Sequence, residues 1–139
     1  MKKVKFLKNK SVFLQDCGIY SNQIIVAIEC EKQDILNWLT KQERIKKEAI
    51  DWIKGENEAF EIFNEMNALV AHNDGKLMLL LKKVEDDWDY LETLLHELNH
   101  VVWYIARDRR FRDEMEAQAY LQEYLFHSIR RKLTMIEKI

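Results

Sequence analysis

The stretch whose residue types could do chemistry is His96-Glu97-Leu98-Asn99-His100, which has the pattern His-Glu-x-x-His. On an α-helix, side chains four positions apart lie on the same face, so both imidazoles can point at one metal ion. Zinc accepts such nitrogens at about 2.0–2.1 Å. Glu97 would then sit beside the ion, placed to take a proton from a water bound to it. The spacing therefore indicates a helical zinc site with a general base.

A helix must hold this motif, and the surrounding apolar residues predict one over about 88–107. These residues recur at helical spacing and form the stripe Leu91, Leu95, Leu98, Val102 and Ile105. Such a stripe packs against a core while the opposite side stays in solvent. His96 and His100 lie on its flank, where they can face a cleft. Asp86 and Asp87 are candidate N-caps of this helix.

A catalytic zinc ion normally has three protein ligands and one open position, so a third ligand is required. A second helix is predicted over 111–139, where apolar residues again recur at helical spacing. Glu116 lies near the start of this returning helix and is the candidate third ligand. Glu114 is the alternative, and because the two positions are about 200° apart on a helix, only one can face the metal. The apolar stripe of the second helix puts Glu116 at its edge and Glu114 outside it, which favours Glu116.

The two motifs together, His96-Glu97-x-x-His100 and Glu116-x-x-Ala119-Tyr120, resemble the gluzincin arrangement of zinc metallopeptidases. They are similar in particular to the small metallopeptidase-like proteins of bacteriophages and prophages. The resemblance covers about residues 91–125. It implies a small zincin-like domain in which His96, His100 and Glu116 hold Zn²⁺ and Glu97 is the general base.

One position departs from the larger gluzincins, which often carry an aspartate four residues after the glutamate ligand. This chain has Tyr120 there. The phenol of Tyr120 is a candidate catalytic donor, to a metal ligand or to the oxyanion of a tetrahedral intermediate. The alternative is a half-buried core tyrosine.

The N-terminal half is predicted to supply a sheet and short helices. Strands are expected over 4–14 and 20–30, the second being rich in β-branched residues after an Asp-Cys-Gly turn. Asp34 is expected to cap a first helix, and a charged helix is expected over 42–55. Residues 56–64 fit either a short helix or a strand.

The turn His72-Asn73-Asp74-Gly75 predicts a hairpin that joins 66–71 to 76–84. Within it, Leu77–Leu81 is a candidate sheet edge for pairing with an extended peptide, although a core strand is the simpler interpretation. The expected fold is one α+β domain spanning 1–139. It has an N-terminal antiparallel or mixed sheet with helices, and a C-terminal pair of antiparallel helices that carries the metal site.

The composition of the chain limits the classes of function that it can have. The chain has 139 residues, 47% of them hydrophobic, and a net charge of −2, which gives no argument for a nucleic-acid or membrane partner. No apolar run approaches the length of a membrane span, and the basic N-terminal start lacks the apolar segment of a signal peptide. Cys17 and Cys30 lack metal-type spacing and are expected to be free thiols. A cytoplasmic location is therefore expected, in a bacterial host if the protein is phage-encoded.

The leading functional hypothesis is a zinc-dependent enzyme that hydrolyses a peptide or protein substrate. The alternative from another class is a non-catalytic, zinc-stabilised binding or structural module. A third hypothesis, a metal-free helical interaction protein, requires the motif to be accidental. His72 is expected in an exposed turn, and His127 is expected about 16 Å from Glu116 along the second helix, too far to be a ligand. The oligomeric state is left open.

Overall fold

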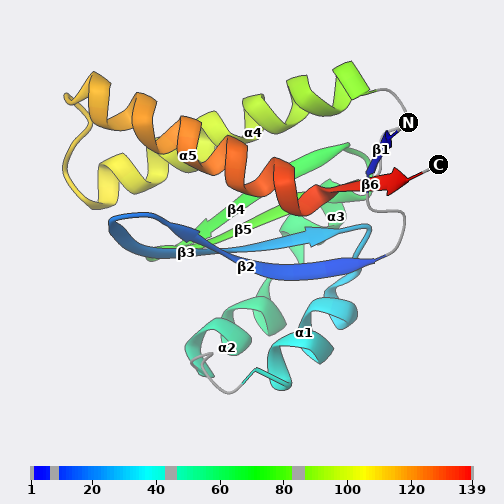
Figure 1. Cartoon of the computed structure of the whole chain (residues 1–139). Helices are drawn as coiled ribbons and strands as arrows, with labels where there is room; N and C mark the ends of the chain where they lie inside the picture. The colour runs from blue at the N-terminus through cyan, green and yellow to red at the C-terminus, as the bar shows by residue number, and fades with distance from the viewer. Residues whose placement is uncertain (1, 7–9, 43–46, 83–86, 139) are drawn as a thin grey trace.

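A four-stranded mixed sheet forms the centre of the molecule. The computed structural model describes residues 2–6, 10–42, 47–82 and 87–138 (Figure 1). The strand order in the sheet is β2 (Ser11–Cys17), β3 (Tyr20–Ile28), β5 (Lys76–Leu81) and β4 (Ala68–Asn73). Strands β3 and β5 are parallel, and the other neighbouring pairs are antiparallel. The predicted α+β class and the mixed sheet are therefore confirmed.

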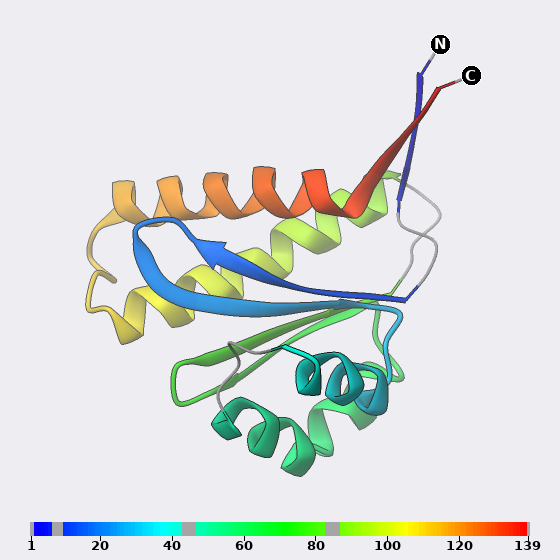
Figure 2. The same cartoon turned by 60° about the horizontal axis from the view of Figure 1, so that its bottom comes forward.

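Helices cover both faces of this sheet and give the fold three layers. One face carries the three short helices α1 (Lys32–Thr40), α2 (Lys47–Gly55) and α3 (Glu58–Phe63). The other face carries the two long helices α4 (Asp87–Asp108) and α5 (Met115–Leu133), seen above the sheet in Figure 2. Within the described residues, no helix combines the length and apolarity that crossing a membrane requires.

The two central strands are buried on both faces, which explains their almost continuous apolar sequences. Val26 and Leu79 point into the core beneath α4 and α5, whereas Ile25 and Met78 point into the core beneath α1, α2 and α3. Strand β5 lies between β3 and β4, so Leu77–Leu81 is a core strand and is not the sheet edge. The edge beside it is β4.

The hairpin between β4 and β5 forms where the sequence predicts it. Asn73 and Lys76 are the last paired residues, which leaves a two-residue loop of Asp74 and Gly75. Both loop residues have positive φ, 46° and 81°, as a type I′ turn requires. Glycine takes this conformation without strain and aspartate tolerates it, so the Asp-Gly pair determines both the turn and the strand register.

The two ends of the chain differ from the sequence prediction. The predicted strand over 4–14 is two strands in different sheets, β1 (Lys2–Phe6) and β2. The predicted helix over 111–139 ends at Leu133, and β6 (Thr134–Lys138) follows it. Strands β1 and β6 pair antiparallel and form a ribbon that extends away from the layered body (Figure 2). Residues far apart in sequence make this pairing, so no local pattern could indicate it.

The structure also gives the first residues of α1, α3 and α4, which the sequence had left open or placed differently. Asp34 is not the cap of α1: Glu31 is the N-cap, and its backbone N–H donates to Asp34 Oδ2 at 2.9 Å in a capping box. The ambiguous stretch 56–64 contains helix α3. Of the two candidate caps of α4, Asp87 is the first helical residue, and Asp86 lies outside the described residues.

Two leucines of the apolar stripe of α4 provide a matched pair that tests how this helix packs on the sheet. Leu98 is fully buried, whereas Leu95, which the sequence placed in the same stripe, is 41% exposed. We expect Leu98→Ala to lower the free energy of unfolding by about 2–5 kcal/mol, because it leaves a cavity. Leu95→Ala should cost less than about 1 kcal/mol. Urea denaturation monitored by circular dichroism measures both, and equal losses would contradict this orientation of α4.

Candidate metal centre on helix α4

Helix α4 packs against the sheet through one side, and this decides where the motif points. Leu94, Leu98, Val101 and Ile105 are fully buried on that side. Each residue advances about 100° around a helix, so positions 96 and 100 fall on the opposite side. Both histidines are accordingly exposed. They lie on the outer side of α4, not on the flank that the sequence predicted, because Leu95 is not part of the buried stripe.

The structure brings the two histidines of the motif together. His96 Nε2 and His100 Nε2 are 3.2 Å apart, and the two rings meet edge to face with centroids 4.9 Å apart. Two imidazoles in such contact are linked by a hydrogen bond when one nitrogen is protonated and the other is not. The two Nε2 atoms therefore lie in direct contact on the outer side of α4.

This spacing fits a shared metal ion. Two zinc–nitrogen bonds of about 2.0–2.1 Å at a tetrahedral angle hold their nitrogens roughly 3.3–3.4 Å apart. The 3.2 Å between His96 Nε2 and His100 Nε2 is within a few tenths of an ångström of that separation. His96 and His100 therefore fit as two ligands of a divalent ion without a change of helix geometry.

Glu97 lies between the outer and the buried sides of the same helix. It is only 8% exposed, although His96 before it and His100 one turn later are both exposed. Burial raises the pKa of its carboxyl group, and the neighbouring His100 and His96 act in the opposite direction. Within the described part of the chain, the carboxylate has no hydrogen bond or ion pair. Glu97 is thus a nearly buried acid with free oxygens next to the histidine pair.

The structure does not bring Glu116 to this pair. Among the described residues, no three histidine, cysteine, aspartate or glutamate side chains gather as a metal site. The reason is the shape of the helical hairpin: Glu116 lies in the first turn of α5, across from the last turn of α4. His100 is eight positions before the end of α4, about 12 Å along its axis. Glu116 is also exposed, on the side of α5 opposite its buried residues.

The other residues that the sequence singled out on this side are also exposed. Glu114 precedes α5, and its backbone carbonyl accepts from Gln118 at 3.1 Å. Tyr120 is 68% exposed, so the alternative of a half-buried core tyrosine is wrong, while its catalytic role stays a prediction. His127 is exposed on α5 and belongs to no metal-binding group among the described residues.

The flank of α4 that carries Glu97 faces the edge strand β4. Tyr104, seven positions after Glu97 and therefore on nearly the same side, stacks on His72 of β4 with ring centroids 4.4 Å apart. Helix α4 packs against β4 along this line. The exposed edge of the sheet therefore runs beside the Glu97 side of the helix.

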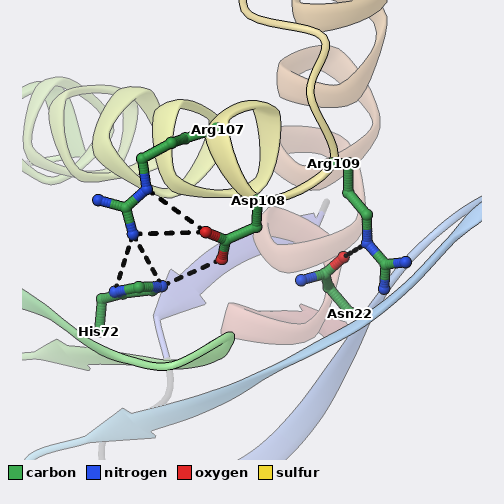
Figure 3. Close-up of polar contacts among 5 residues, drawn as sticks. All are labelled: Asn22, His72, Arg107, Asp108 and Arg109. Carbon is green, nitrogen blue, oxygen red and sulfur yellow. Dashed lines mark hydrogen bonds and ion pairs between the residues drawn. The ribbon is translucent and has the colours of Figure 1, made fainter.

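Polar contacts at the end of α4, which the sequence did not reveal, fix the helix onto the sheet (Figure 3). His72 Nε2 donates to Asp108 Oδ2 at 3.1 Å, and the His72 side chain is only 12% exposed, so the prediction of an exposed turn histidine is wrong. Arg109 Nε donates to Asn22 Oδ1 at 2.8 Å on β3. These partners are 36 and 87 positions apart in the chain, too distant for a sequence pattern to pair them.

Comparison with known proteins adds no relative. No protein-family model matches the chain, and neither a curated protein nor a solved structure matches it.

The geometry predicts which side chains a bound metal depends on. His96→Ala and His100→Ala should each weaken Zn²⁺ binding by at least about tenfold, because each removes one of two nitrogen ligands. His127→Ala is the matched control on α5 and should bind as the parent does. Isothermal titration of tag-free protein with zinc provides the measurement.

The same titration tests the ligand that the sequence favoured. Because Glu116 is remote from the histidines here, we expect Glu116→Ala to retain the parent's zinc affinity. A loss as large as that of His100→Ala would show that the helical hairpin repacks around the metal to bring Glu116 in. The arrangement of α4 and α5 described above would then be wrong for the metal-bound protein.

Proposed function

We propose that this protein is a zinc-dependent hydrolase of peptide bonds, with its centre at His96, His100 and Glu97. The observation that carries the proposal is the 3.2 Å contact between the two Nε2 atoms, with Glu97 nearly buried next to them. Two histidines one turn apart approach each other on any helix, so the nearly buried Glu97 beside them is the part that an accidental pattern would not supply. A zincin-like relationship is consistent with a helix of this kind lying beside the edge of a mixed sheet.

The residues have distinct roles in this proposal. A zinc ion held by His96 and His100 would supply Lewis-acid polarisation of a carbonyl group and would acidify water. Glu97 takes the proton from the attacking water and passes it to the leaving amine. Its free oxygens and low exposure suit this role, because few waters compete for the carboxylate. The exposed edge of β4 offers backbone groups that can pair with an extended peptide.

A non-catalytic, zinc-stabilised binding module is the second candidate, and the ligand count favours it. Two exposed histidines gather here, whereas a catalytic zinc ion normally has three protein ligands. A two-ligand site on an open helix face leaves room for a ligand from a partner. This candidate requires no base at position 97.

Two buried free thiols support the proposal of a cytoplasmic protein whose chemistry lies on α4. Cys17 and Cys30 are both free and buried. Burial raises the pKa of the Cys17 thiol to about 12 and also raises that of Cys30, so neither is a thiolate at neutral pH. We therefore place the protein in a cytoplasm and the chemistry on α4.

Glu97→Gln separates the two candidates. If Glu97 is the general base, the variant keeps its zinc and loses peptide hydrolysis by about 10²- to 10⁴-fold. Glu92→Gln, at an exposed position of the same helix, is the matched control and should hydrolyse as the parent does. Cleavage of a quenched-fluorescence peptide library and the zinc content are measured on the same samples.

The outcomes of this experiment are distinct. Turnover that survives in Glu97→Gln would remove Glu97 as the base. Zinc bound by the parent at His96 and His100 with no hydrolysis of any library peptide would favour the binding module.

A further inference from the structure

A cavity of about 880 Å³ lies at the end of the sheet, away from the histidine pair. It is bounded by the start of β3, the β4–β5 turn, the first turn of α2 and the end of α4. Ligand sites typically occupy about 300–1,000 Å³, so the cavity is large enough for a small organic molecule. It shares no residue with the candidate metal centre.

Arg109 extends from the end of α4 into the lining of this cavity. Only some of its N–H groups donate hydrogen bonds within the protein. Its Nε donates to Asn22 Oδ1 at 2.8 Å, and its Nη2 donates to Ser21 Oγ. Both contacts use one edge of the guanidinium group and engage neutral oxygens. A guanidinium has five N–H donors, so the edge between Nη1 and Nη2 is left for a carboxylate. No carboxylate pairs with Arg109 among the described residues.

Asn22 supplies the second and independent sign of a ligand. It lines the cavity, yet it is only 8% exposed. Its oxygen is turned toward Arg109 and its nitrogen points to the other side (Figure 3). In the described part of the chain, that nitrogen has no hydrogen-bond partner. The nitrogen is open to solvent on the cavity side, so an acceptor of a bound molecule can take the place of water there.

The charges of the lining restrict what that molecule is. Arg109 and Lys76 are the two cationic groups, and three carboxylates belong to Glu48, Asp74 and Asp108. Asp108 is engaged with His72, whereas no ion pair of Glu48 or Asp74 is found in the described residues. A polyanion such as a nucleotide would meet more negative than positive groups. A ligand with one carboxylate and one ammonium group would match both kinds of group.

We propose that this cavity binds a short peptide through its free ends. The carboxylate lies on the open edge of Arg109, with Lys76 as a further donor. The ammonium group lies toward Glu48 and Asp74. The site is separate from the metal centre, so a test of peptide binding here does not depend on the proposed hydrolase activity.

The test is a titration of the isotope-labelled protein with trialanine, followed by amide NMR in the presence of EDTA so that no metal takes part. We expect saturable shifts confined to residues 21–23, 48–49, 74–77 and 108–109. Alanine, acetate and inorganic phosphate are titrated in parallel. Each should bind at least about tenfold more weakly than trialanine, because acetate and phosphate carry no ammonium group and alanine holds its two charged groups on a single residue.

Two variants test whether the NMR shifts report binding at this cavity. Arg109→Gln should weaken trialanine binding at least about tenfold, and Lys76→Gln should also weaken it, without disturbing the contact of α4 with β3. Arg112→Gln, in the exposed loop after α4, is the control and should bind as the parent does.

Three outcomes would overturn the proposal. One is the absence of saturable shifts at the cavity with trialanine. Another is tighter binding of phosphate, which would reassign the site to a phosphate ligand. The last is unchanged binding in both Arg109→Gln and Lys76→Gln.

Discussion

The burial of one side of α4 against the sheet is the constraint on which the rest of the structure depends. On the buried side of this helix lie Leu94, Leu98 and Ile105, all three fully buried. Rotation of α4 about its own axis would expose them to solvent. Burial of such side chains contributes roughly 1.5–3 kcal/mol each, far more than any surface contact of the helix. Once this side is fixed, the helical period alone turns His96 and His100 outward and leaves Glu97 on the flank beside β4.

Much of this arrangement follows from local sequence patterns. The helix that carries His-Glu-x-x-His, the buried β3 and the β4–β5 hairpin all lie close to their predicted bounds, because each depends on residues adjacent in sequence. Apolar periodicity determines a helix, a run of β-branched residues determines a buried strand, and Asp74-Gly75 determines a type I′ turn. The convergence of His96 and His100 is equally local, since they are one helical turn apart.

The predictions that failed needed information about packing. Leu95 fits a helical stripe, but α5 does not cover it, so it remains 41% exposed. A short connection between α4 and α5 places Glu116 across from the end of α4, an axial offset that no sequence pattern gives.

The most direct test of the central claim is zinc X-ray absorption spectroscopy on tag-free protein loaded with one equivalent of metal. We expect two imidazole ligands at about 2.0–2.1 Å, with oxygen ligands filling the remaining positions. Loss of both imidazole signals in the variant His96→Ala/His100→Ala would assign them to α4. A protein that retains no zinc, or a spectrum without imidazole scattering, would contradict the claim that His96 and His100 form a metal centre.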